Sequence, residues 1–138
     1  IYAKSLPVAI VKGALKRLEL LKTKPELREQ VWNVARALQD GLRKQNFDIG
    51  PTQSPVTPVY MLGEPDEAVA LATDLRENHR LFVSLVTYPV VERGVIIIRM
   101  IPNATHSLED VERTLEGFQA VRKRLENGEY KTIAEGAN

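Results

Sequence analysis

Residues 81–110 read LFVSLVTYPVVERGVIIIRMIPNATHSLED, a run that contains two apolar segments and the start of a helix. The segments Leu81–Thr87 and Val95–Ile101 are rich in β-branched residues, which favour strands. A Tyr88-Pro89 break and a short connector ending in Arg93-Gly94 separate them. Because a connector this short cannot hold a crossover, the two strands are predicted to pair in antiparallel fashion.

The sequence around this pair predicts helices and one further strand. Ser107 is expected to cap a helix over 107–126, with Asp110 at its third position as in a capping box. Pro58 falls inside a strand predicted over 56–62 and favours an edge or bulge there. Further helices are expected over 7–21, over 25–45 after a Thr23 cap, and over 65–79. The order α-α-β-α-β-β-α predicts an α+β fold, with a small antiparallel (or mixed) three-stranded sheet backed by long helices.

Apolar residues recur at helical spacing in the first predicted helix, where they are Val8, Val11, Leu15 and Leu18. We expect the charged residues between them to face solvent. The last ten residues have little hydrophobic pattern, which predicts a frayed or extended tail. We therefore expect one domain over 1–126, which includes the leading helix at 1–22, and a tail over 127–138.

The composition restricts the possible function classes. The 138 residues include 19 basic and 18 acidic ones, for a net charge of +1, and we see no basic stripe interleaved with aromatic residues. Nucleic-acid binding is therefore not expected. No apolar run approaches the roughly 20 residues that cross a bilayer, so no membrane span is expected. The absence of cysteine excludes disulfides and thiolate chemistry in this chain, and it is compatible with a reducing cytoplasm.

Arg99 is the main candidate functional residue, because it is the one charge in a strand of Val, Ile and Met residues. Burying a guanidinium without a partner costs on the order of several kcal/mol, because the ion loses its hydration. Arg99 is therefore expected either to reach water at an open edge or to bind an anion. Its planar fork matches a carboxylate. From strand context alone, that carboxylate can be a structural Asp or Glu, or it can belong to a ligand.

The remaining polar residues form no complete catalytic set. His106 precedes the helix cap and is interpreted as a hydrogen-bonding turn residue. His79 lies 27 positions away at a predicted helix end, which is not a metal-site spacing. The sequence has no Gly-rich phosphate loop and no Ser-x-x-Lys or Gly-x-Ser-x-Gly pattern.

Three segments resemble motifs of the α-oxoamine synthases. IYAKSLP at 1–7 is similar to the family's "F-S/T-x-S-L/M-P-P" segment. YPVVERG at 88–94 is similar to its "Y-P-x-V-P-x-G" connector, with Glu92 where the family usually has Pro. RMIPNATHS at 99–107 is similar to its "R-x-x-x-x-A-A/T-H-T/S" strand-to-helix turn. The resemblance runs from Ile1 to about Leu125.

This resemblance implies the C-terminal small domain of a fold-type I enzyme that depends on pyridoxal 5'-phosphate. The family condenses an amino acid with an acyl-CoA, and this chain would be of the 8-amino-7-oxononanoate synthase or glycine C-acetyltransferase type. Arg99 matches the family's arginine that binds the carboxylate of the amino-acid substrate. Ser5 matches a segment whose hydroxyls reach the cofactor phosphate of the partner subunit. A cytoplasmic homodimer is implied.

No lysine in this chain lies in the family's cofactor-lysine motif, so the resemblance implies that this lysine lies upstream. We expect the 138-residue chain alone to be inactive and to bind pyridoxal phosphate poorly. Two alternatives stay open at this point. One is a free-standing ACT-like or ferredoxin-like module that binds amino acids, since residues from Val56 onward have the order β-α-β-β-α. The other is an interaction domain that docks onto a larger partner.

Overall fold

The computed structural model describes residues 5–131, in which four long helices and three strands follow one another in the predicted order and residues 129–131 add a short helical turn. Their bounds are α1 Val8–Thr23, α2 Pro25–Lys44, β1 Thr57–Leu62, α3 Pro65–His79, β2 Ser84–Val86, β3 Val95–Met100 and α4 Leu108–Glu126. The strand predicted over Leu81–Thr87 is shorter than expected, because only residues 84–86 pair with a neighbour. Among residues 5–131, no helix combines the length and the apolar character that a membrane span requires.

One helix boundary differs from its prediction. Thr23 does not cap α2; it is the last residue of α1, and its hydroxyl donates to the backbone oxygen of Glu19 at 2.9 Å. Lys24 alone separates the two helices, so Pro25 begins α2 directly. By contrast, the capping box of α4 is confirmed, with Ser107 and Asp110 bonding each other's backbone N–H groups.

The sheet has the order β1-β3-β2, and both pairings are antiparallel, as predicted. β3 is therefore the central strand, and β1 is an edge strand. Pro58 in β1 faces Arg99 of β3. Because proline has no N–H to donate, an edge strand is where a sheet tolerates it. The edge position expected for Pro58 is confirmed.

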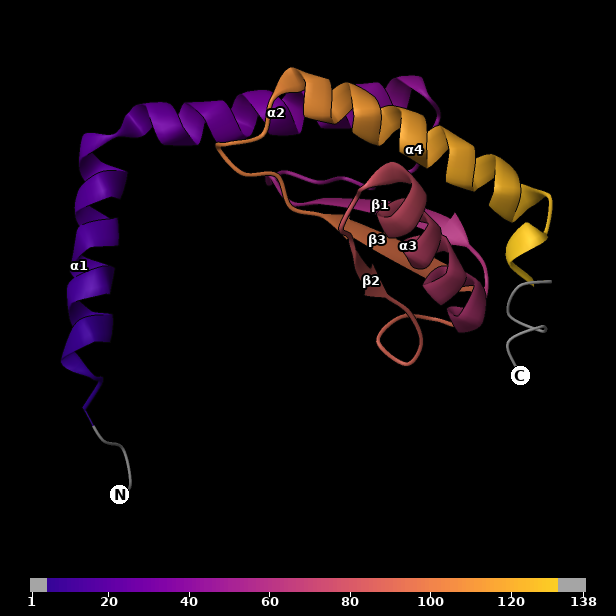
Figure 1. Ribbon diagram of the computed structural model, residues 1–138, viewed down its shortest axis with the longest axis horizontal. Helices are drawn as coiled ribbons and strands as arrows, with labels where there is room; N and C mark the ends of the chain where they lie inside the picture. Colours follow the sequence, from indigo (N-terminus) through magenta and orange to yellow (C-terminus); the bar gives the residue numbers. More distant parts are fainter. Residues whose placement is uncertain (1–4, 132–138) are drawn as a thin grey trace.

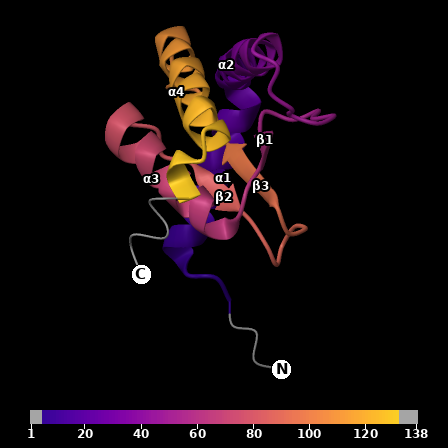
Figure 2. The same ribbon diagram turned by 90° about the vertical axis from the view of Figure 1, so that its right-hand side faces the viewer.

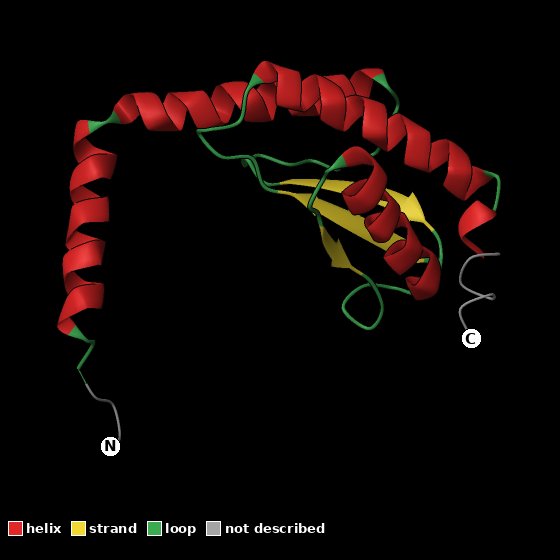
Figure 3. Ribbon diagram, viewed as in Figure 1, coloured by secondary structure: helices red, strands yellow, loops and turns green. Residues whose placement is uncertain are grey.

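The core lies between one face of the sheet and three helices, α2, α3 and α4 (Figure 2). Ile96 and Ile98 of β3 are fully buried and point toward these helices, while Arg99 is exposed. This alternation follows from the two-residue period of a strand. Figure 3 shows the helices on one side of the yellow sheet, and no helix of the described chain covers its other side. The predicted architecture of a sheet with helices on one face is thus observed.

Helix α1 extends away from this core, at a steep angle to α2 (Figure 1). None of its residues is buried, and its apolar stripe is 40% to 70% exposed. The apolar stripe of Val8, Val11, Leu15 and Leu18 is therefore not buried in the described part of the chain. The physical reason is that no other described element lies along that side of α1, so the stripe has no surface to pack against.

The segment after α4 is not wholly a frayed tail. Tyr130 is fully buried, and its hydroxyl donates to Asp74 Oδ2 of α3 at 2.5 Å. Arg124 of α4 pairs with the same oxygen at 2.5 Å and with Glu129 at 2.8 Å. The expectation of a frayed tail was wrong for Tyr130, because one aromatic residue outside any periodic pattern finds a buried site between α3 and α4. Residues 132–138 lie outside the described range, and the division at 126/127 stays a prediction.

Gly117 on α4 provides a test of the packing between helices. A Cβ placed there would lie 2.8 Å from Leu81 Cδ1 and 3.2 Å from His79 Cβ. Alanine gains about 1 kcal/mol of helix propensity over glycine, whereas overpacking a core costs about 1–3 kcal/mol. Because His79 Cβ moves only with its backbone, we expect Gly117→Ala to lower the free energy of unfolding by about 1 kcal/mol.

The matched control is Gly13→Ala on α1, where a Cβ would meet nothing within 4 Å. We expect this variant to be neutral or stabilising by up to about 1 kcal/mol. Urea unfolding followed by circular dichroism measures both. Equal stability of Gly117→Ala and Gly13→Ala would show that α4 does not pack against His79 as described.

Candidate functional site

The candidate site lies on the face of the sheet that the helices leave open. Arg99 is the next-to-last residue of β3, and the register places it between Pro58 of β1 and Ser84 of β2. Residues two positions apart on a strand share a face, so Ile97 lies beside it on the same side. Arg99 thus reaches water from a position on the central strand, with strands on both sides to hold its backbone.

The guanidinium of Arg99 has a neutral partner. Its Nη2 donates to Ser84 Oγ at 3.1 Å. Within residues 5–131, no Asp or Glu side chain forms an ion pair with Arg99. The alternative of a structural acid partner is therefore not observed in the described part of the chain. A guanidinium carries five N–H donors, and one hydrogen bond to a hydroxyl leaves most of them available to an anion.

A hollow of about 330 Å³ adjoins Arg99. Its walls come from β1, β2, β3 and the loop before β1, and they consist mainly of Ile49, Pro51, Val56, Pro58, Tyr60, Val86 and Ile97, with the hydroxyl residues Thr52 and Ser54. The loop is held in place because both hydroxyls donate to the backbone oxygen of Val56, at 3.0 and 3.1 Å. A cation beside a largely apolar hollow is suited to a small molecule with a carboxylate and a less polar part.

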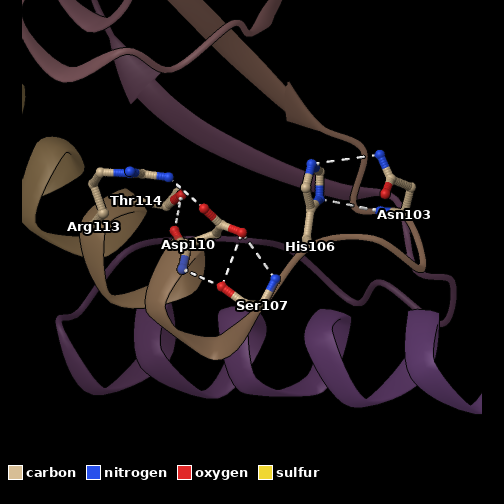
Figure 4. Close-up of polar contacts among 6 residues, drawn as sticks. All are labelled: Asn103, His106, Ser107, Asp110, Arg113 and Thr114. Atoms are coloured by element: carbon tan, nitrogen blue, oxygen red, sulfur yellow. Dashed lines mark hydrogen bonds and ion pairs between the residues drawn. The ribbon is translucent and has the colours of Figure 1, made fainter.

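The turn between β3 and α4 is structural (Figure 4). Asn103 donates its backbone N–H to His106 Nδ1 at 3.2 Å, and its side-chain oxygen accepts from the backbone of Thr105 at 2.8 Å. The interpretation of His106 as a hydrogen-bonding turn residue agrees with this geometry. The backbone and hydroxyl hydrogen bonds from Ser107 lower the pKa of Asp110, which keeps the cap of α4 ionised.

Ser5 is exposed and precedes α1. The 16 residues of α1 form a helix about 24 Å long that separates Ser5 from α2. The structure therefore does not bring Ser5 and Arg99 together. The rest of that motif, residues 1–4, lies outside the described residues.

The described residues around Arg99 include neither a lysine nor a metal site. No lysine lines the hollow beside Arg99. In the described ranges, no three His, Asp or Glu side chains gather as a metal site would require. Sequence reasoning missed Ser84, whose contact with Arg99 depends on strand register. What this chain brings to the site is thus an exposed arginine with its hydroxyl partner.

Comparisons with known proteins give relatives over nearly the whole chain. A profile described as aminotransferase class I and II matches residues 1–118. A cysteate-C-fatty acyltransferase from Capnocytophaga ochracea is 51% identical over 132 residues, which cover 96% of this chain and 31% of that protein. An 8-amino-7-oxononanoate synthase from Exiguobacterium sibiricum is 32% identical over 127 residues, 91% of this chain and 32% of that protein. This chain spans about a third of the length of these curated relatives.

Two solved structures resemble the fold. A serine palmitoyltransferase from Sphingomonas wittichii superposes with a TM-score of 0.77 at 28% identity, covering 89% of this chain and 31% of that one. An 8-amino-7-oxononanoate synthase from Francisella tularensis superposes with a TM-score of 0.73 at 19% identity, over 93% and 36% of the two chains. The second likeness concerns the fold alone. Both confirm the predicted small-domain fold, and neither compares the side chains around Arg99.

Proposed function

Because this chain belongs to the aminotransferase class I and II family, we propose that it is the C-terminal part of an α-oxoamine synthase that depends on pyridoxal 5'-phosphate. Such an enzyme joins an amino acid to an acyl-CoA. The observation that carries this proposal is Arg99, an exposed arginine on the open face of the sheet whose side chain contacts a hydroxyl and, in the described chain, no acid. The family membership favours this proposal over a free-standing ACT-like module.

The relatives support two choices of substrates. The relative that is 51% identical is named for cysteate and a fatty acyl group, and several at about 30% identity are named 8-amino-7-oxononanoate synthase. We take cysteate and a fatty acyl thioester as the first candidates, because identity is much higher to that relative. A glycine C-acetyltransferase activity is supported only by the connector motif at 88–94. Each of these enzymes uses an amino acid, and every amino acid has the α-carboxylate that Arg99 would bind.

The role of this chain in the reaction is to bind and orient. The guanidinium of Arg99 would hold the substrate carboxylate through two parallel hydrogen bonds, a geometry that fixes the amino acid as well as binding it. The hollow beside Arg99 would exclude water from one side of the bound amino acid. Ser5 would contact the cofactor phosphate of the partner subunit, since it matches the corresponding motif. Pyridoxal phosphate, when bound, supplies the electron sink that lets a bond at the α-carbon break.

The cofactor lysine would come from a part of the enzyme outside this chain. We further propose that the enzyme is a cytoplasmic homodimer, as the resemblance implies. The lack of cysteine agrees with a reducing compartment.

The test uses the full-length gene product purified with pyridoxal phosphate. We expect a stable visible absorbance band from bound cofactor, a change of that band with one of cysteate, glycine, alanine or serine, and release of CoA thiol only when an acyl-CoA is also present. The 138-residue chain alone, as control, should retain no band after desalting. A full-length protein with no band, or with a band that none of these amino acids alters, would refute the proposed function.

A further inference from the structure

Ser84 and Arg99 face each other across the β2–β3 pair. Directly opposed residues on antiparallel strands have side chains close enough to contact each other on the same face. Here the contact is the 3.1 Å hydrogen bond from Arg99 Nη2 to Ser84 Oγ, and it joins residues 15 positions apart in sequence. Within residues 5–131, neither side chain forms another hydrogen bond.

The hydrogen bond restricts how the guanidinium can be used. A guanidinium has two edges that can hold a carboxylate, one formed by Nε and Nη2 and the other by Nη1 and Nη2. Each edge uses a different hydrogen of Nη2. Whichever of these hydrogens Ser84 accepts, one complete edge stays free for a bidentate contact. The same bond also restricts the rotamers of the long Arg99 side chain. The entropy of those rotamers would otherwise be lost when the ligand binds.

We propose that Ser84 is a positioning residue for Arg99. Ser84 holds the guanidinium so that one bidentate edge faces the carboxylate of the amino-acid substrate. This inference rests on the proposed function. Ser84 does not itself contact the substrate carboxylate. Its contribution is to keep the fork of Arg99 in one orientation before the substrate arrives, and it therefore acts on carboxylate binding alone.

The expected effect of Ser84→Ala is moderate. A hydrogen bond between an exposed charged group and a hydroxyl contributes modestly, so we expect the dissociation constant of the amino acid to rise about 5-fold. The KM for the amino acid should rise by the same factor, with the KM for acyl-CoA unchanged. Ser84→Thr keeps the hydroxyl and should restore most of the affinity.

The experiment measures amino-acid binding to full-length holoenzyme through the cofactor absorbance band, for wild type, Ser84→Ala, Ser84→Thr and Arg99→Ala. Each protein is titrated with the preferred amino acid and with the matching amine that lacks the carboxylate. Thr73→Ala is the control for hydroxyl loss, since the exposed Thr73 donates to the backbone oxygen of Val69 on α3, on the helix side of the sheet. The double variant Ser84→Ala/Arg99→Ala completes a double-mutant cycle.

Two results would support the positioning role. Ser84→Ala should lower the affinity for the amino acid and leave the affinity for the amine unchanged. In the Arg99→Ala background, the same substitution should have no further effect on either affinity. Equal affinities of Ser84→Ala and Thr73→Ala for the amino acid would overturn it while leaving the proposed function intact. Weakening that persists in the Arg99→Ala background would also overturn it. Absence of any response in wild type would overturn both this inference and the proposed function.

Discussion

Arg99→Ala is expected to weaken binding of the amino-acid substrate to the full-length enzyme by about 100-fold, or about 3 kcal/mol. The reason is that two charge-assisted hydrogen bonds to the carboxylate disappear together, and no other cation lines the hollow beside Arg99. The measurement is the titration of the cofactor absorbance band with the amino acid. The band itself should persist without substrate, because Arg99 is proposed to bind substrate and not cofactor.

The control is Arg99→Lys, which keeps the positive charge and loses the fork. We expect an intermediate loss of about 10-fold, because an ammonium cannot reproduce the bidentate geometry. The melting temperature of both variants should stay close to that of wild type, since Arg99 is exposed and its described hydrogen bond is to a single hydroxyl. If Arg99→Ala binds the amino acid as wild type does, the carboxylate role is wrong. Severe unfolding of both variants would instead indicate a structural role for this arginine.

Tyr130→Ala is expected to lower the free energy of unfolding of the 138-residue chain by about 3–4 kcal/mol. Tyr130 is fully buried, and removing its ring leaves a cavity that the surrounding helices fill only in part. Its loss also leaves the buried carboxylate of Asp74 without one of its hydrogen-bond donors. Urea unfolding followed by circular dichroism at neutral pH gives the difference.

Tyr130→Phe separates the contribution of the ring to stability from that of the hydroxyl. It keeps the packing and loses the bond to Asp74, so we expect a smaller cost of about 1–2 kcal/mol. Glu129→Gln is the control, because the pair between Arg124 and Glu129 is partly exposed and such pairs contribute little. If Tyr130→Ala costs no more than Glu129→Gln, the segment after α4 is not anchored by its tyrosine.

The stability that the Asp74 network contributes is expected to depend on pH. Burial acts to raise the pKa of Asp74, but hydrogen bonds from Asn78 and Tyr130 and the charge of Arg124 outweigh it and hold this pKa below its ordinary value. A carboxyl whose pKa is lowered by folding binds fewer protons in the folded state. Its contribution is therefore fully present above the unfolded pKa and is lost as pH falls through the folded pKa. The difference between wild type and Tyr130→Phe should shrink over that acidic range and stay constant at neutral pH.

Local sequence signals predicted most of the elements and the candidate arginine. The capping pair Ser107 and Asp110 placed the start of α4, because each side chain accepts from a backbone N–H three residues away. Pro58 indicated an edge strand, because proline has no backbone N–H of its own. Arg99 was found because a lone charge in an apolar strand needs a specific explanation. Motif resemblance then supplied the family, which the profile match and the structural likeness confirm.

Three features could not be read from the sequence, because each depends on a partner distant along the chain. The stripe of α1 has helical spacing, but periodicity does not say whether another element covers it. Tyr130 is buried because α3 and α4 bring Asp74 and Arg124 to it, from 56 and 6 positions away. The contact of Ser84 with Arg99 requires the register of β2 against β3, which a shift of one residue would abolish.

The sequence by itself therefore determined the order of the elements, the antiparallel pairing of the two later strands and the choice of Arg99 as the candidate functional residue. These depend on propensities, caps and connector length, which are properties of neighbouring residues. Only the tertiary structure decided which face of the sheet stays open, that Arg99 lies on it beside a hydroxyl instead of an acid, and that Tyr130 closes the core. Those outcomes follow from packing between distant segments, since burial and hydrogen bonding are settled only when every element has found its place.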